Sequence, residues 1–140
     1  MTRNQEPGTS NYVSAPLEGR RILVLDDDHS ILESVRHFLE FNGASIFPFD
    51  HGPSAIAWLE EQSNRCDAVM TDIRMPVMNG FLFVRQIRET LGLLHLPVFA
   101  ITGEDLHEHS PEFVSAGFTG LIRKPFDPDT LLEKICSHAF

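Results

Sequence analysis

The sequence predicts an α/β fold in which a doubly wound, five-stranded parallel sheet carries helices on both faces. Five short apolar segments alternate along the chain with five segments whose apolar residues recur at helical spacing. Most of the apolar segments are continuous, which is typical of strands buried on both sides. A chain of 140 residues is long enough for one such domain.

The first two β-α units are predicted in the first half of the chain. Residues 22–25, Ile-Leu-Val-Leu, form a strand that runs into three aspartates. Apolar residues over 31–39 then recur at intervals of three or four, which predicts a helix that ends at Asn42-Gly43. A second strand follows over 44–49, and a second helix opens at Gly52 and continues to about Gln62.

The next strands end at polar residues. Residues 67–71 predict the third strand, which ends at Asp72. A Met-Pro-x-Met-Asn-Gly loop over 75–80 leads into the third helix. The fourth strand is predicted over 97–101 and ends at Thr102.

The last elements are shorter and more polar. A helix is expected over about 104–116, with Pro111 breaking or starting it. Residues 119–123 form the fifth predicted strand, which ends at Lys124-Pro125. The final helix runs from about residue 128 to 138, with an apolar stripe.

The first 20 residues differ from the rest of the chain. They are rich in Pro, Gly, Ser and Asn and show no hydrophobic period, so residues 1–20 are expected to be a flexible tail and 21–140 the domain. They also contain no apolar region of the kind that forms a secretory signal.

Charge and composition exclude several classes of protein. Eleven basic residues against twenty acidic residues give a net charge of −9, which argues against direct binding to nucleic acid or to an anionic membrane. No apolar run approaches the roughly 18–20 residues of a membrane-spanning helix. Two cysteines without metal-ligand spacing indicate a reduced protein, so the expected compartment is the cytoplasm.

Polar side chains gather where the predicted strands end. Asp26 and Asp27 follow the first strand, Asp72 the third, Thr102 the fourth and Lys124 the fifth. In open parallel sheets, ligands bind at the carboxyl ends of the strands, so these residues are expected to share one rim.

This set of side chains favours phosphoryl transfer to an aspartate. Close carboxylates ionise together only beside a cation, and oxygen ligands suit Mg²⁺. A carboxylate beside Mg²⁺ can attack phosphorus, while Thr102 and Lys124 supply a hydroxyl and a positive charge to the phosphoryl oxygens. Neighbouring side chains on a strand point to opposite faces, so Asp26 and Asp27 can share a cation only where the chain bends.

Taken in order, these motifs resemble a response-regulator receiver domain of two-component signalling, of the single-domain type. The resemblance covers about residues 20–140. Its spacing is specific, with 45 positions from Asp27 to Asp72, 30 from Asp72 to Thr102 and 22 from Thr102 to Lys124. The motifs that carry it are Ile22-Leu23-Val24-Leu25-Asp26-Asp27-Asp28, Asp72-Ile73-Arg74-Met75-Pro76-Val77-Met78-Asn79-Gly80, Ala100-Ile101-Thr102, Ala116-Gly117 and Lys124-Pro125-Phe126.

The resemblance implies a flavodoxin-like strand order 2-1-3-4-5 and a role for each rim residue. Asp72 would be the phosphoacceptor. Thr102 would bond the phosphoryl group and move towards it on activation, and Lys124 would pair with it. The peptide bond between Lys124 and Pro125 would be cis. The Mg²⁺ ligands would be Asp26, Asp27, Asp72 and the backbone carbonyl of Arg74.

The function implied is that of a signalling module, which catalyses only its own phosphorylation and dephosphorylation. It would take phosphate from a sensor histidine kinase or a histidine phosphotransfer protein and act on an unknown downstream protein. It would act without direct contact with nucleic acid or membrane. Whether the chain stands alone or is a piece of a longer hybrid kinase is open.

The sequence departs from the family at two positions. Leu121 stands where the family usually has an aromatic residue that reports activation, and Gly103 replaces the usual alanine after Thr102. A signal carried by backbone shifts is therefore expected. The resemblance also implies that Arg74 and Glu104 overhang the pocket. There they would slow hydrolysis of the acyl phosphate, either as a pair or with Arg74 on the phosphoryl oxygens. The alternative is that they are two independent, solvated side chains.

Two other functions fit part of the pattern. Asp26-x-Asp28 resembles the nucleophile motif of haloacid-dehalogenase-type phosphatases, but the further acidic pair and the cap domain of that family are missing. A receiver-like docking module without chemistry is disfavoured by the complete acidic pocket. Asp28 itself is expected to cap the following helix.

Overall fold

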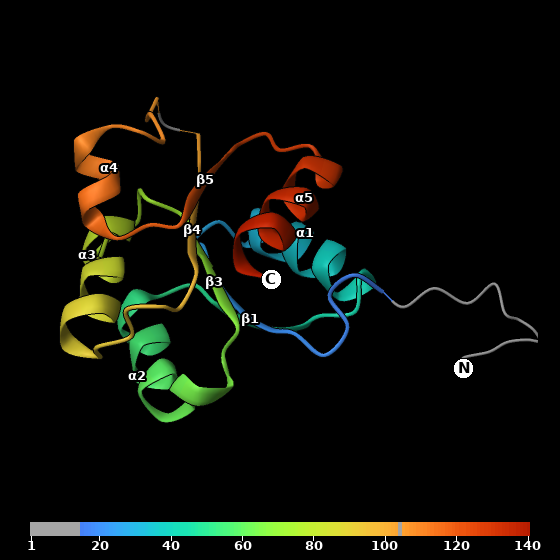
Figure 1. Cartoon of the computed structure of the whole chain (residues 1–140), viewed down its shortest axis with the longest axis horizontal. Coiled ribbons are helices and arrows are strands. Elements are labelled where there is room, and N and C mark those ends of the chain that lie inside the picture. The colour runs from blue at the N-terminus through green and yellow to red at the C-terminus, as the bar shows by residue number, and fades with distance from the viewer. Residues whose placement is uncertain (1–14, 104) are drawn as a thin grey trace, which may run out of the picture.

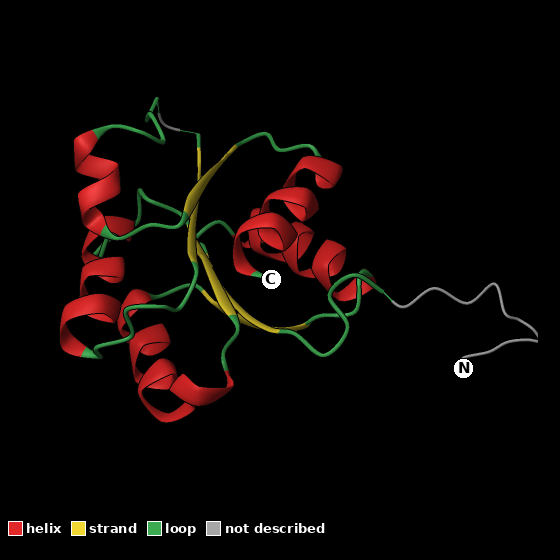
Figure 2. Ribbon diagram, viewed as in Figure 1, coloured by secondary structure: helices red, strands yellow, loops and turns green. Residues whose placement is uncertain are grey.

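The computed structural model describes residues 15–103 and 105–140 and contains the predicted parallel sheet. Its five strands lie in the order β2-β1-β3-β4-β5, and every neighbouring pair is parallel (Figures 1 and 2). The strands are β1 (Arg21–Leu25), β2 (Ser45–Phe49), β3 (Ala68–Thr71), β4 (Val98–Thr102) and β5 (Gly120–Arg123). Both the fold class and the strand order are as expected.

Helices cover both faces of this sheet. The α-helices are α1 (His29–Phe41), α2 (Gly52–Gln62), α3 (Gly80–Arg85), α4 (Pro111–Ala116) and α5 (Pro128–Ala139). In Figure 1, α1 and α5 lie on one side of the sheet and α2, α3 and α4 on the other. Within the described part of the chain, none of the helices has the length and hydropathy to cross a membrane.

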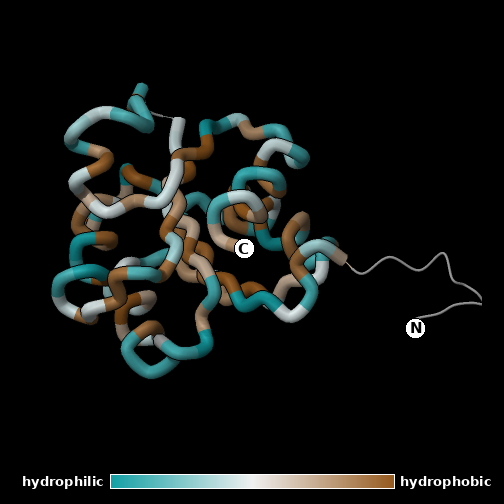
Figure 3. The backbone as a smooth tube through the Cα atoms, viewed as in Figure 1, coloured by the Kyte–Doolittle hydropathy of each residue, from teal (hydrophilic) through white to brown (hydrophobic). Residues whose placement is uncertain are grey.

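The alternation of side chains along β1 divides the core between the two faces. Ile22 and Val24 pack into the cluster that faces α1 and α5, whereas Leu23 and Leu25 pack into the cluster that faces α2 and α3. All four are almost fully buried. Figure 3 shows the hydrophobic residues gathered along the central strands.

Side-chain caps define where the helices begin. Asp28 accepts hydrogen bonds from the backbone N–H groups of Ser30 and Ile31 at the start of α1, which confirms its expected capping role. Asn79 caps α3 and Asp127 caps α5 in the same way. These caps satisfy backbone donors that have no partner within the helix.

The two helices on either side of β4 differ from prediction. The helix α4 begins only at Pro111, with Ser110 as its cap, because a proline suits the first turn of a helix and not its interior. The third helix has α-helical geometry only to Arg85 and continues as a π-helical turn over Gln86–Thr90. The described residues before Pro111, 105–110, therefore form a loop.

The two outermost strands, β2 and β5, each leave one edge unpaired within the described sheet. Pro48 lies in the middle of β2, opposite Val24. Proline lacks an N–H group, so it is tolerated within a strand only at an edge.

The packed part of the chain begins before the predicted boundary at residue 20. Leu17 is fully buried in the cluster under α1, and its N–H group donates to the Asn42 carbonyl at 2.8 Å. The Arg20 guanidinium lies over the Phe140 ring, 4.0 Å from its centroid. The segment lacks a hydrophobic period because a single leucine anchors it. The rest of the predicted tail, residues 1–14, lies outside the described residues.

We expect the substitution Leu17→Ala to lower the free energy of unfolding by about 2–5 kcal/mol, because it removes a buried side chain and leaves a cavity. Urea unfolding of the full chain measures this change. The matched control is Leu94→Ala, since Leu94 is 67% exposed. Equal effects of the two substitutions would show that the segment before Arg21 does not stabilise the domain.

Candidate functional site

The structure brings the predicted polar residues to one rim of the sheet. Asp26 directly follows β1, Asp72 follows β3, Thr102 ends β4 and Lys124 follows β5. Backbone hydrogen bonds continue the strand pairing into this rim, from Asp72 N–H to the Leu25 carbonyl and from Lys124 N–H to the Thr102 carbonyl. The parallel sheet therefore places these side chains at the same edge.

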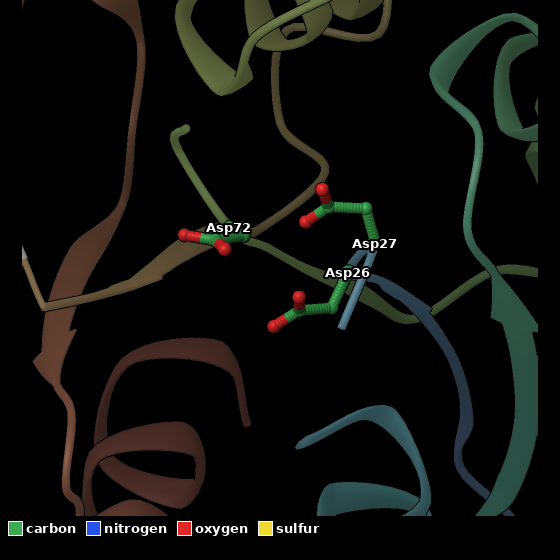
Figure 4. Close-up of side chains that lie close together, drawn as sticks. All are labelled: Asp26, Asp27 and Asp72. Atoms are coloured by element: carbon green, nitrogen blue, oxygen red, sulfur yellow. The ribbon is translucent and has the colours of Figure 1, made fainter. Parts of the chain in front are cut away.

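Three carboxylates form a cluster at the centre of the rim. One oxygen each of Asp26, Asp27 and Asp72 lies within 4.8 Å of the others (Figure 4). The Asp28 N–H group donates to Asp26 Oδ1 at 2.9 Å, which bends the chain immediately after β1. This bend is the departure from extended geometry that Asp26 and Asp27 need in order to approach one another.

Lys124 joins two of these carboxylates. Its Nζ donates to Asp26 Oδ2 at 2.9 Å and to Asp72 Oδ2 at 3.1 Å. All three side chains are largely buried, so water screens the attraction only weakly. One ammonium group therefore holds the ends of β1, β3 and β5 together.

Burial and charge shift the pKa values at this site in opposite ways. Burial raises the pKa of Asp26 above its ordinary value, and this effect outweighs the bonds from Asp28 N–H and Lys124. Burial also disfavours the charged form of Lys124, but the hydrogen bonds to Asp26 and Asp72 together keep the pKa of Lys124 above its ordinary value. The lysine thus stays protonated between the two carboxylates.

The loop after β3 holds Asp72 in place. Asp72 Oδ1 accepts from the Ile73 N–H group at 2.7 Å, and the Gly80 N–H group donates to the Ile73 carbonyl. A Cβ atom at position 80 would lie 2.5 Å from the Asp72 carbonyl oxygen, so only glycine permits this approach. This role of Gly80 was not predicted, although a glycine just before a helix is a visible signal for close contact.

The remaining predicted residues lie around this cluster. Thr102 is buried, and the register that sets Thr71 opposite Ala100 places Thr102 one residue further along the rim than Asp72. Arg74 is exposed in the loop that follows Asp72. Its expected pairing with Glu104 lies outside the described residues, because Glu104 does.

Leu121, which stands where the family usually has an aromatic residue, is part of the hydrophobic core. Leu121 is buried on β5 and packs in a small cluster with Ile73, Ala100 and Phe113. The peptide bond between Lys124 and Pro125 is cis, as the resemblance implied.

The donor set suits a hard divalent cation. Within the described part of the chain, Asp26, Asp27 and Asp72 form the one group of three carboxylate, histidine or cysteine side chains close enough to share a metal ion. Three carboxylates against one ammonium leave net negative charge, and oxygen-only ligands favour Mg²⁺ or Ca²⁺ over softer metals.

Comparison with known proteins agrees with this fold. The family model described as response regulator receiver domain matches residues 22–136. The chain belongs to this family, whose members act as receivers in the phosphorylation-based signalling of two-component systems.

Individual relatives show the same relationship. Response regulator MprA of Mycobacterium sp. (strain KMS) is 36% identical over 115 residues, which cover 82% of this chain and 48% of that protein. Probable histidine kinase 6 of Oryza sativa subsp. japonica is 28% identical over 151 aligned positions, covering 95% of this chain and 16% of the rice protein. The chain spans about half the length of the curated response regulators that it matches.

Solved structures match across the whole domain. The chemotaxis protein CheY4 of Vibrio cholerae superposes with a TM-score of 0.77 at 34% identity, covering 85% of this chain and 98% of that one. A CheY-like receiver domain protein of Methanospirillum hungatei has a TM-score of 0.73 at 30% identity, covering 84% and 91%.

We expect Lys124→Met to lower the free energy of unfolding by about 1–3 kcal/mol when divalent cations are chelated, because it leaves two buried carboxylates without their counter-charge. Because the pKa of Lys124 lies above its ordinary value of 10.5, the lysine's contribution is complete at neutral pH and is lost only as the pH rises through the folded-state pKa.

Urea unfolding of both proteins at pH 7 and at alkaline pH checks this expectation. The control is Lys124→Arg, which keeps the positive charge. Equal free energies of unfolding for wild type and Lys124→Met at pH 7 would contradict the stabilising role of the lysine.

Proposed function

We propose that this domain accepts a phosphoryl group on Asp72 from the phosphohistidine of a sensor histidine kinase or histidine phosphotransfer protein. Phosphorylation then changes how the domain binds a downstream protein. The observation that carries this proposal is the pair of hydrogen bonds from Lys124 to Asp26 and Asp72, beside a third carboxylate.

Accessibility favours Asp72 as the nucleophile. Lys124 holds both Asp26 and Asp72, but Asp26 is 3% exposed and Asp72 is 9% exposed. In the transfer, an Asp72 carboxylate oxygen bonds to phosphorus as the phosphorus–nitrogen bond breaks. The electron pair of that bond stays on the imidazole nitrogen, which takes up a proton.

The other rim residues bind the transferred group and balance its charge. Asp26, Asp27, Asp72 and the backbone carbonyl of Arg74 would hold Mg²⁺, which when bound supplies positive charge to the phosphoryl oxygens. The Lys124 ammonium pairs with those oxygens, and the Thr102 hydroxyl donates to one of them.

The domain acts as a phosphoacceptor and not as an enzyme with an external product. Its own residues promote only the gain and loss of the phosphoryl group. We place this exchange in the cytoplasm, with which the free cysteines Cys66 and Cys136 are consistent. No direct contact with nucleic acid or membrane is part of the proposal.

The geometry disfavours the phosphatase alternative. In that alternative, Asp26 and Asp28 form the nucleophile motif of the phosphatase. Asp28 instead caps α1, where its Oδ1 accepts from Ser30 and Ile31, and Asp26 is the most buried of the three clustered carboxylates. The two readings predict different outcomes for substitutions at Asp72 and Asp26.

We expect Asp72→Asn to abolish covalent uptake of phosphate from a small acyl-phosphate donor, because the amide is not a nucleophile for this transfer. Intact-protein mass spectrometry, with acetyl phosphate and Mg²⁺, measures the adduct. Asp28→Asn is the matched control, because asparagine caps a helix as well as aspartate does. An adduct retained in Asp72→Asn but lost in Asp26→Asn would instead indicate the phosphatase.

We expect weak binding of Mg²⁺ at the three carboxylates, weakened about tenfold or more by Asp27→Ala. A titration followed by amide chemical shifts should show the largest changes around residues 26–27 and 72–74. The same titration of Asp28→Asn should match wild type. A shift pattern elsewhere, or unchanged affinity in Asp27→Ala, would contradict this assignment of the metal ligands.

A further inference from the structure

Glu108 attaches the loop between Thr102 and α4 to the far side of β5. Its Oε2 accepts from the Leu121 N–H group at 3.0 Å, and its carboxylate pairs with Lys134 Nζ on α5 at 2.9 Å. We call this three-residue contact the Glu108 clasp. In the same loop the Leu106 carbonyl accepts from the Arg123 guanidinium, so both described contacts pull the loop towards β5.

The clasp is built from charged groups that are partly removed from water. The side chains of Lys134 and Glu108 are 23% and 31% exposed. Burial alone would raise the pKa of Glu108, but the bonds from Lys134 and Leu121, with a smaller effect of His109, lower it. The carboxylate therefore stays charged and keeps both partners at neutral pH.

Leu121 connects the clasp to the residue next to Asp72. Its N–H group points to Glu108, while its side chain belongs to the buried cluster that also contains Ile73, Ala100 and Phe113. Ile73 in turn donates its N–H group to Asp72 Oδ1. One buried cluster therefore contains both Leu121, which is bonded to the clasp, and Ile73, which is bonded to Asp72.

The loop starts at the rim, and its described contacts with β5 and α5 lie further along the chain, at Leu106 and Glu108. Thr102 is at the rim, and Glu108 follows it six residues along the chain. A phosphoryl group on Asp72 would replace the single carboxylate charge by about −1.5 to −2 and place three strong acceptor oxygens next to Thr102 and Lys124. A Thr102 hydroxyl drawn to those oxygens pulls the loop away from these contacts with β5 and α5.

We propose that Glu108 is a positioning residue that holds this loop in its resting arrangement, and that phosphorylation of Asp72 releases Glu108 from Leu121 and Lys134. This inference rests on the proposed phosphorylation of Asp72. Release changes the shape of a surface groove of about 410 Å³, whose lining includes Glu108, Leu121, Phe126 and Lys134. The state of Asp72 is thereby transmitted to a surface on which a partner can read it.

Hydrogen exchange of the full-length wild-type protein tests the release directly. With Mg²⁺ and beryllofluoride as the phosphoryl mimic, we expect the Leu121 amide to exchange about tenfold faster or more than without the mimic, because it loses its acceptor. An unchanged Leu121 amide, in a sample whose amides near Asp72 do shift, would overturn the clasp while leaving phosphorylation intact.

Substitutions test whether the clasp restrains phosphorylation. We expect Glu108→Gln and Lys134→Met to accept phosphate from acetyl phosphate about three- to tenfold faster than wild type. In these variants the contacts of the clasp that oppose the movement of Thr102 are weaker. Glu112→Gln, an exposed site on α4, should react at the wild-type rate.

The outcomes separate the two proposals. Variants that are less stable in urea but accept phosphate at the wild-type rate would show that Glu108 is only structural. No adduct on Asp72 of the wild-type protein would overturn the proposed function and the clasp with it.

Discussion

The site depends on one ammonium group placed between two carboxylates. Lys124 reaches Asp26 and Asp72 across 98 and 52 positions of sequence, so this contact exists only when the sheet has formed. The same charge that compensates the repulsion between the carboxylates also ties three strands at the rim. Fold and chemistry thus share an interaction, and a change to either carboxylate alters the counter-charge available to the other.

The sequence was sufficient to predict the sheet and the members of its rim. Strands buried on both faces are continuous apolar runs, and each run ends at a polar residue such as Asp72 or Thr102. Because strands in a parallel sheet all point the same way, knowing where each one ends was enough to predict which side chains meet. The sequence showed that Asp26 and Asp27 can share a cation only if the chain bends there. It did not predict the bend itself, because the bend depends on a hydrogen bond from the Asp28 N–H group.

Contacts between distant segments were beyond the reach of sequence patterns. Leu17 is a single apolar residue in a polar segment, and its burial follows from a space under α1 that only the folded domain creates. Glu108 lies in a polar stretch that predicted a helix, and nothing local indicates that its partners are on β5 and α5. Both residues act through tertiary contacts, and hydrophobic periodicity indicates only local secondary structure.

The two ends of the sheet also bear on how the protein behaves at high concentration. A free strand edge offers a row of unpaired backbone groups on which another chain can add a strand. In β2, Pro48 removes one of the donors that such pairing would use, and at β5 the carboxylate of Glu108 already occupies the outward N–H group of Leu121. Each edge therefore carries its own obstacle to sheet growth, which protects the domain against edge-to-edge aggregation.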